Sequence, residues 1–181
     1  AQSGPGGVGG TPIVMLGDGT YMMMNSDIYS TVLSGHKLIV AVCDTGGYAV
    51  ALAASMKHIF TGGEGETMFS TSDIGWVVGH SYIIYGPLLA GMATIMYEGT
   101  PLRPDAGIWW QIVEKYKVTV MFSAPTAVRV LKKQDPAFLK KHDLSSLKHL
   151  FLAGEPLDET SHKWIMEELG IPVIDNYWQT E

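Results

Sequence analysis

Runs of apolar residues alternate with amphipathic stretches along most of the chain. Short runs rich in β-branched and aromatic residues predict strands, and longer stretches with helical periodicity predict helices. We expect strands at residues 13–16, 38–42, 67–70, 93–97, 118–122, 149–152 and 173–177. We expect helices at residues 21–33, 48–60, 79–91, 108–116, 125–133 and 158–169, with a polar surface connection over 135–148. This alternation predicts an α/β fold whose open, mostly parallel sheet is flanked by helices.

One uncharged run is long enough to raise the question of a membrane span. Residues 74–97 contain no Asp, Glu, Lys or Arg, and a run of that length is long enough to cross a bilayer. Its four glycines, Pro87 and His80 instead favour a buried helix followed by a buried strand. We therefore expect no membrane partner.

Composition narrows the choice of function classes. Hydrophobic residues make up 46% of the 181 residues and charged residues 17%, which is typical of a globular protein. The formal net charge of -6 argues against nucleic acid as a partner. The single cysteine, Cys43, lies in an apolar run and is expected to be a buried thiol, so neither a disulfide nor a cysteine zinc site is expected. The glycine-rich start does not resemble a signal peptide, and we expect a cytoplasmic location.

Ligands of open parallel sheets bind beyond the C-terminal ends of the strands. Three loops in such positions carry suitable residues, namely GDG at 17–19, AGEP at 153–156 and NYWQTE at 176–181. The aromatic residues Trp76, Trp109, Trp110 and Trp164 are expected to pack in the core, as are Met22, Met23 and Met24. Four lysines are expected on a solvated surface: Lys132, Lys133, Lys140 and Lys141.

The first 44 residues contain a motif of their own. An aspartate between two glycines at a strand end can bind a divalent metal that bridges a diphosphate. The segment resembles the thiamine-diphosphate-binding C-terminal part of trihydroxycyclohexanedione hydrolases, in which an asparagine about 27 residues later completes the metal site. Position 45 is instead Thr45, whose hydroxyl is a weaker ligand for a hard cation. We therefore favour a loop role for Asp18 over Mg²⁺ binding, and do not expect thiamine diphosphate as a cofactor.

The remaining residues resemble a different family. The stretches DTGGYAVALAASM, SDIGWVVGHSYIIYGPLLAGMATIMYEG, MFSAPTAVRVLKK, DLSSLKHLFLAGEPLD and VIDNYWQTE are similar, in order and spacing, to AMP-forming acyl-CoA synthetases. Within that family the propionyl-CoA synthetases are the most similar branch, and the acetyl-CoA synthetases come next. The resemblance implies a partial N-terminal core of such an enzyme, with ATP, CoA and a small carboxylate as ligands and Mg²⁺ as the metal.

The resemblance also implies roles for individual residues. Thr180 would bond the α-phosphate and Glu181 would hold Mg²⁺, which are catalytic roles, while Tyr177 is a candidate for stacking on the base. The residues that it places around ATP and AMP are Gly154, Glu155, Pro156, Asp175, Asn176, Tyr177, Trp178, Gln179 and Thr180.

The acyl pocket implied by the resemblance is small and apolar. Its residues are Val77, Val78, Ala153 and Trp178, and Val78 and Leu102 match positions that lie beside CoA. One methylene in such a pocket discriminates by only about 1–3 kcal/mol, so propionate and acetate both remain open as substrates. For His80 we favour a structural role with satisfied hydrogen bonds over a role as a base.

Two parts of the acyl-CoA synthetase pattern are missing from the sequence. A phosphate loop of the form TSGTTGxPKG should precede DTGGYAV, and the later domain with its catalytic lysine should follow residue 181. We therefore expect a chimera with a thiamine-enzyme-like β-α-β segment at 1–44 and a truncated AMP-binding domain at 45–181. The expected function is that of a short-chain acyl-CoA synthetase fragment that is not active alone. A thiamine-diphosphate-dependent hydrolase or lyase fragment and a non-catalytic α/β remnant are the alternatives.

Overall fold

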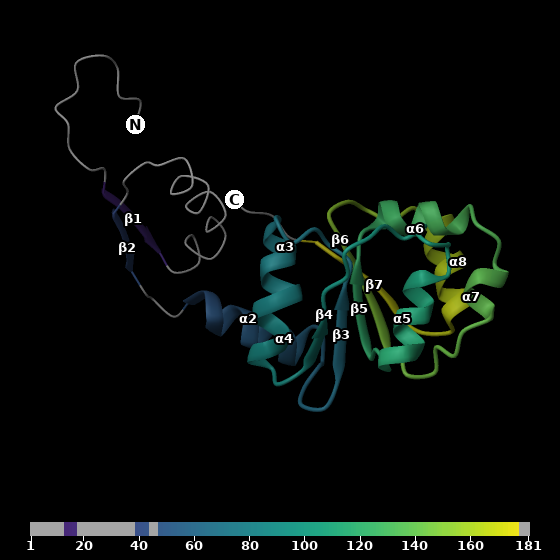
Figure 1. Ribbon diagram of the computed structural model, residues 1–181, viewed down its shortest axis with the longest axis horizontal. Helices are drawn as coiled ribbons and strands as arrows, with labels where there is room; N and C mark the ends of the chain where they lie inside the picture. The colour runs from purple at the N-terminus through teal and green to yellow at the C-terminus, as the bar shows by residue number, and fades with distance from the viewer. Residues whose placement is uncertain (1–12, 18–38, 44–46, 178–181) are drawn as a thin grey trace, which may run out of the picture. The chain divides into compact units, whose positions relative to one another are not determined.

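The computed structural model describes residues 13–17, 39–43 and 47–177, and the chain divides into two compact units, residues 1–50 and 51–181 (Figure 1). In the first unit, strands β1 (Ile13–Gly17) and β2 (Ile39–Cys43) pair in parallel, with Ile13 opposite Ile39. Both strands were predicted from the apolar runs. The helix expected at 21–33, and with it Asp18 and Thr45, lies outside the described residues.

The second unit is built on a five-stranded sheet in the order β4-β3-β5-β6-β7. Every neighbouring pair of strands in this sheet is parallel, which confirms the predicted α/β class. The strands are β3 (Thr67–Ser70), β4 (Ala93–Ile95), β5 (Val120–Ser123), β6 (His149–Ala153) and β7 (Val173–Asn176).

Helices cover both faces of this sheet (Figure 1). One face carries α3 (Val77–Gly79), the π-helical segment η1 (His80–Tyr85), α4 (Gly86–Leu89) and the second-unit part of α2 (Gly47–His58). The other face carries α5 (Ile108–Tyr116), α6 (Pro125–Lys132), α7 (Ala137–Lys140) and α8 (Glu159–Leu169). The short helix α7 interrupts the connection that was predicted to be irregular.

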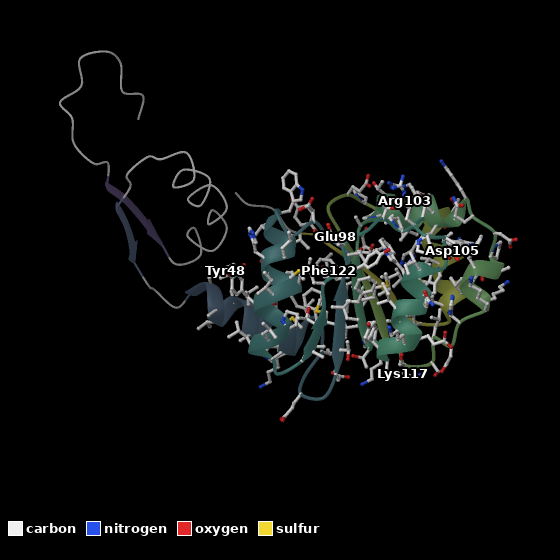
Figure 2. All side chains as sticks on the ribbon, in the orientation of Figure 1. Tyr48, Glu98, Arg103, Asp105, Lys117 and Phe122 are labelled. Carbon is white, nitrogen blue, oxygen red and sulfur yellow. The ribbon has the colours of Figure 1, made fainter. Side chains whose placement is uncertain are left out.

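Alternate residues of the strands β3, β5 and β6 supply the two layers of the core (Figure 2). Phe122 and Phe151 lie on the face of α2 and η1, where both rings contact Phe60, and Phe122 also contacts Tyr82. Residues of opposite parity face α5, α6 and α8, and there the buried cluster includes Phe69, Met121, Leu150, Leu152, Trp109, Trp110 and Ile165. Such nearly continuous apolar strands are typical of a parallel sheet covered on both faces.

The uncharged run at 74–97 folds as the continuous helical segment α3–η1–α4 followed by β4, which confirms the predicted helix and strand. The predicted burial of the strand is wrong, because Ala93 is exposed and Thr94 and Ile95 are only half-buried. Gly79 is required there, because a Cβ at this position would lie 2.1 Å from the main-chain oxygen of Asp73. In the described part of the chain no helix is long and apolar enough to cross a membrane.

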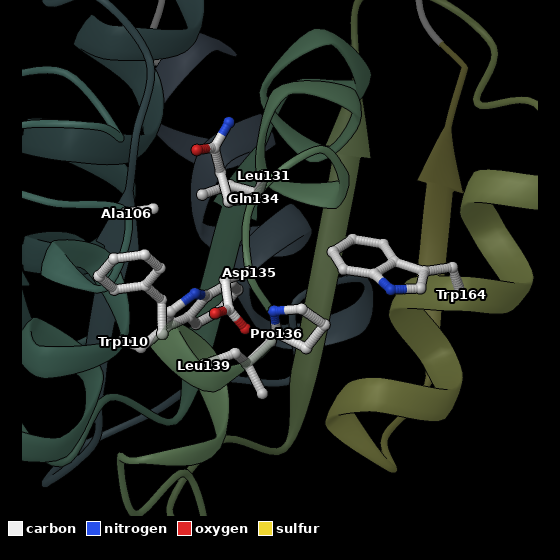
Figure 3. A pocket seen from close by; sticks show the side chains of 9 residues that line it. Ala106, Trp110, Leu131, Gln134, Asp135, Pro136, Leu139 and Trp164 are labelled. Carbon is white, nitrogen blue, oxygen red and sulfur yellow. The ribbon is translucent and has the colours of Figure 1, made fainter.

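A small pocket lies in the helix layer, between α5, the connection after α6, and α8 (Figure 3). Its walls include Trp110, Pro136, Leu139 and Trp164. None of the residues predicted to contact a substrate lines this pocket, so it is not the candidate site.

Candidate functional site

The direction of the chain connections reverses between the neighbouring strands β3 and β5. The chain leaves β3 through helices on one face to reach β4, and it leaves β5 through α6 on the opposite face to reach β6. Open α/β sheets bind ligands outside the C-terminal strand ends at such a reversal. At this point the Thr71 hydroxyl donates to Ser123 Oγ at 2.8 Å, and the Thr71 amide donates to the Phe122 carbonyl at 2.9 Å. Neither Thr71 nor Ser123 was predicted as a site residue.

The two predicted nucleotide loops lie next to each other at the same edge. In the β6–β7 pair Leu152 is opposite Asp175 and Ala153 is opposite Asn176, so residues 154–156 and Tyr177 leave adjacent strands. A hydrogen bond of 3.1 Å from the Leu157 amide to Asp175 Oδ2 joins the two segments directly. The remaining predicted residues of this loop, Trp178, Gln179, Thr180 and Glu181, lie outside the described part of the chain.

The loop after β6 offers an open backbone edge. Gly154 has φ +108°, a conformation that side chains disfavour, and a Cβ built there would meet no atom within 4 Å. Glu155 and Pro156 are exposed, and the Tyr177 ring is 87% exposed. A flat, accessible main chain near an exposed aromatic ring fits a planar heterocycle such as adenine.

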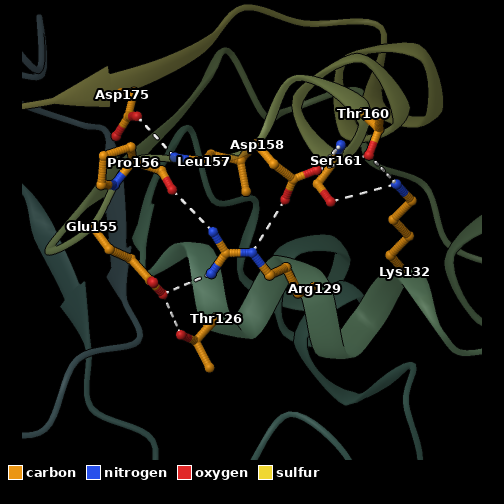
Figure 4. A network of polar contacts seen from close by, with 10 residues as sticks. All are labelled: Thr126, Arg129, Lys132, Glu155, Pro156, Leu157, Asp158, Thr160, Ser161 and Asp175. Atoms are coloured by element: carbon orange, nitrogen blue, oxygen red, sulfur yellow. Dashed lines mark hydrogen bonds and ion pairs between the residues drawn. The ribbon is translucent and has the colours of Figure 1, made fainter.

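Arg129 on α6 fixes this loop from the side of the helix layer (Figure 4). Its Nη2 donates to the Pro156 carbonyl at 2.9 Å, its Nη1 lies 2.9 Å from Glu155 Oε1, and its Nε lies 3.1 Å from Asp158 Oδ2. The Thr126 hydroxyl, one turn earlier on α6, also donates to the Glu155 carboxylate. Neither Thr126 nor Arg129 was predicted to be a site residue.

Hydrogen bonds to these charged groups shift their titration. The Thr126 hydroxyl, followed by the Arg129 guanidinium, lowers the pKa of Glu155 below its usual value. The Thr160 hydroxyl and the Ser161 amide lower the pKa of Asp158, which caps α8 through a 2.9 Å bond from that amide. The two carboxylates in turn raise the pKa of Arg129. The network is therefore fully charged at neutral pH.

The residues predicted for the acyl pocket come from two places along the same edge. Val77 and Val78 begin α3, just after the C-terminal end of β3, and both are half-buried. Ala153 ends β6 and is buried. Because β5 lies between β3 and β6, the two strand ends are separated by two strand spacings, about 10 Å. Leu102, predicted beside CoA, lies in the turns after β4 and is partly exposed.

Two predictions about aromatic and polar side chains need correction. Trp76 is 70% exposed and does not pack in the core, because it precedes the first turn of α3 in an extended conformation. His80 is buried as expected, but its Nδ1 has no hydrogen-bond partner, so it is not the satisfied histidine that was predicted. Trp109 and Trp110 are buried, and Trp164 packs against the core.

The surface lysines also differ in part from expectation. Lys133, Lys140 and Lys141 are exposed as predicted, whereas Lys132 is half-buried and bonds the hydroxyls of Thr160 and Ser161 on α8. Over residues 47–177, no group of three or more His, Cys, Asp or Glu side chains is placed to hold a metal ion. Glu181, the predicted Mg²⁺ ligand, is not among these residues.

Comparison with known proteins identifies relatives for most of the chain. The model of one protein family, described as AMP-binding enzyme, matches residues 41–181. The chain is 69% identical over 138 residues to propionate–CoA ligase of Salmonella typhimurium, an alignment that covers 76% of this chain and 22% of that protein. It is 43% identical over 138 residues to acetyl-coenzyme A synthetase of Wolinella succinogenes, covering 75% and 21% respectively.

A third relative is aligned over more of the chain. Acyl-CoA synthetase short-chain family member 3, mitochondrial, of Bos taurus is 40% identical over 193 aligned positions, which cover 94% of this chain and 28% of that protein. The chain therefore spans about a fifth to a quarter of the length of these relatives.

Proposed function

This chain belongs to the AMP-binding enzyme family, and from that membership we propose that it is part of a short-chain acyl-CoA synthetase. The observation that supports this most directly is the convergence of residues 154–157 and 175–177 on one sheet edge, joined by the bond from the Leu157 amide to Asp175. Propionate is our first choice of carboxylate, because the 69% identical relative is a propionate–CoA ligase, and acetate is the second. A cytoplasmic location accompanies this proposal.

The complete reaction would join a carboxylate to CoA at the expense of ATP. A carboxylate oxygen attacks the α-phosphorus of ATP, and the bond to diphosphate breaks, which leaves an acyl-adenylate. The CoA thiolate then attacks the acyl carbon, and AMP leaves. Mg²⁺, when bound, would neutralise charge on the phosphates.

In this proposal the described residues bind and orient the nucleotide. The main chain of Gly154 and Pro156 would lie against adenine, with Tyr177 stacked on the base, and Asp175 would keep the loop after β6 beside β7. Thr180 would donate to the α-phosphate and Glu181 would hold Mg²⁺, which places charge stabilisation where the transferring group needs it.

The residues of the acyl pocket and those beside CoA are proposed on the same basis, the resemblance to acyl-CoA synthetases. Val77, Val78, Ala153 and Trp178 would form the acyl pocket, with Val78 and Leu102 beside CoA. The apolar character of these side chains suits a carboxylic acid of a few carbons, for which each methylene contributes about 1–3 kcal/mol of discrimination.

Calorimetric titration of the 181-residue chain with AMP tests the nucleotide site. We expect weak, saturable binding of AMP and of adenosine, and much weaker binding of CMP, whose smaller pyrimidine covers less of the open edge. Absence of heat with AMP, or equal affinity for AMP and CMP, would refute the proposed site. Because the chain spans only part of its relatives, we expect it to form no thioester by itself, and thioester formation would contradict that expectation.

We further propose that residues 1–44 form a segment of separate origin, with Cys43 and Thr45 at the junction. The start of the family match at residue 41 supports this boundary. The bovine alignment argues against it, since 94% of the chain cannot be covered without part of the first 44 residues. Sequencing the flanking DNA decides the matter, because a continuous reading frame of one family on both sides would refute a chimera.

The GDG motif at 17–19 is the observation behind a thiamine-diphosphate site in this segment, and we do not propose such a site on that motif alone. Asp18 lies outside the described residues, and no reported relative is a thiamine enzyme. Thermal stabilisation by thiamine diphosphate with Mg²⁺, lost in Asp18→Ala, would reverse that conclusion.

A further inference from the structure

We propose that Arg129 is a positioning residue for the nucleotide, because it sets the shape of the loop at residues 154–157 that would carry adenine. This inference rests on the proposed function, since it assumes that this loop is the one that meets the base. The three contacts of Arg129 fall on the Glu155 side chain, the Pro156 carbonyl and the Asp158 side chain, so they span the loop and the first residue beyond it (Figure 4).

The loop depends on side chains for its conformation. Within the described part of the chain, two hydrogen bonds to its main chain come from side chains, Arg129 to the Pro156 carbonyl and Asp175 to the Leu157 amide. Pro156 has no amide hydrogen, and Gly154 has an unusually wide choice of backbone conformations. Removing Arg129 would therefore leave one side-chain bond to the main chain of the loop, from the Leu157 amide to Asp175, and the bond from Thr126 to the Glu155 side chain.

The geometry requires a guanidinium at this position. The three contacts use Nη1, Nη2 and Nε of one rigid plane, each directed at a different acceptor. A lysine ammonium carries one compact charge on a flexible chain and cannot reproduce three directed contacts together. Replacement by lysine should therefore keep the charge and lose the loop geometry.

The same network defines the role of Glu155. Its carboxylate accepts hydrogen bonds from Arg129 and from Thr126, both on α6, so the side chain anchors the loop to that helix. What the loop then presents to a ligand is its main chain. Arg129 and Glu155 both act on the nucleotide through the loop, and neither needs to touch it.

Lys132 provides a matched control on the same helix. It lies three residues after Arg129, and its ammonium bonds Thr160 Oγ1 at 3.2 Å and Ser161 Oγ at 3.4 Å. These contacts join α6 to the start of α8 without involving residues 154–157. Lys132→Gln therefore removes a cation and two hydrogen bonds from α6 and leaves the loop intact.

The experiment measures nucleotide affinity and loop protection in parallel. AMP and adenosine are titrated calorimetrically into the 181-residue chain carrying Arg129→Gln, Arg129→Lys or Lys132→Gln, and amide hydrogen exchange is followed over residues 149–157. In Arg129→Gln we expect both ligands to bind roughly tenfold more weakly, by the same factor, because the loop meets the base and not the phosphate. Arg129→Lys should resemble it, and Lys132→Gln should stay within twofold of the parent chain.

Hydrogen exchange separates loop positioning from general destabilisation. The Leu157 amide should exchange faster in both Arg129 variants, while amides of β6 keep the protection of the parent chain. Unchanged affinity and unchanged loop exchange in Arg129→Gln would overturn the inference, as would an effect of equal size in Lys132→Gln. If Arg129→Gln fails to fold, the charge-conserving Arg129→Lys decides the question with the same criteria.

The two proposals can fail separately. If the parent chain binds neither AMP nor adenosine, the proposed nucleotide site fails, and with it the positioning of a nucleotide by Arg129. If the parent chain binds both ligands and Arg129→Gln binds them equally well, only the inference about Arg129 fails.

Discussion

The pair of strands at the centre of the sheet, β3 and β5, carries hydroxyl contacts at both ends, and the two ends are built differently. At the N-terminal end Thr119 Oγ1 donates to the Thr67 carbonyl at 3.1 Å and accepts from the Thr67 amide at 3.3 Å. At the C-terminal end the Thr71 hydroxyl donates to the Ser123 hydroxyl at 2.8 Å. One end therefore uses a side chain to satisfy the main chain, and the other pairs two side chains with each other.

Ion pairs at the two ends of the strands also differ, in how much main-chain bonding already holds the residues that they join. At the N-terminal edge Lys148 pairs with Glu66, and main-chain bonds already fix both residues, from Lys148 to Thr119 at 2.8 Å and from Ala93 to Glu66 at 2.9 Å. At the C-terminal edge Arg129 fixes the loop at residues 154–157, which has no main-chain to main-chain bond within residues 47–177. Substitutions at the N-terminal edge should therefore change stability, whereas those at the C-terminal edge should change ligand binding.

Gly154→Val should produce the largest effect at the C-terminal edge. At φ +108° a β-branched side chain is strained, and the cost is about 1–3 kcal/mol of unfolding free energy although the site has room for the extra atoms. Relief of the strain would move the loop, so AMP binding should be lost as well. Urea unfolding and calorimetry measure the two effects.

Gly63→Ala is the matched substitution at the other edge. A Cβ at Gly63 also meets no atom within 4 Å, and its φ lies outside the left-handed region. We expect a change within about 0.5 kcal/mol and no loss of AMP binding. Equal costs for Gly63→Ala and Gly154→Val would show that the two edges do not differ in the proposed way.

The two threonines of the central strand pair permit a second comparison by urea unfolding. Thr119→Val keeps the shape of the side chain but removes the partner of the Thr67 amide and one of the two donors to the Thr67 carbonyl, which should cost about 1–2 kcal/mol. Thr71→Val should cost less, about 0.5–1 kcal/mol, because the Ser123 hydroxyl can rotate to another partner. The reverse order of costs would contradict the contrast between the ends.

Local chemistry explains which parts of this fold could be predicted from the sequence. The predicted bounds of β3 (Thr67–Ser70) and α5 (Ile108–Tyr116) match the structure, since turn-forming residues flank both elements. Pro125 begins α6 and Gly170, at φ 66°, ends α8, as the preferences of these two residues indicate.

Contacts between distant segments could not be predicted in the same way. The strand order places Thr71 beside Ser123, 52 residues later, and periodicity contains no information about that order. Likewise, nothing in a local pattern connects Arg129 with Glu155. The sequence did contain one signal, because Thr126 and Arg129 are three residues apart on a predicted helix and must share a face.

Lys148→Gln should lower the free energy of unfolding by less than Thr119→Val does at the same edge. The Glu66 side chain is 19% exposed and the Lys148 side chain 59%, so the pair is worth about 0.5–1 kcal/mol. Added salt should reduce the difference from the parent chain, because salt screens exposed charges. AMP affinity should stay within twofold, and a larger loss would show that the N-terminal edge also influences the site.

Acid pH should produce the smallest of these effects at the C-terminal edge. Hydrogen bonds from Thr126 and Arg129 lower the pKa of Glu155 in the folded chain, so its contribution to stability is complete above the pKa of the unfolded chain. As the pH falls below about 4, the unfolded chain binds the proton first and that contribution decreases.

The urea midpoints of the parent chain and Arg129→Gln should therefore become closer as the pH falls from neutral towards 3. In Lys132→Gln the difference from the parent chain should stay constant over this range, because Lys132 bonds two hydroxyls and no carboxylate. A parallel decrease in both variants would mean that acid acts on α6 as a whole. A decrease confined to Arg129→Gln would locate the pH-dependent contacts at Glu155 and Asp158, the two carboxylates that join Arg129 to the loop after β6 and to the start of α8.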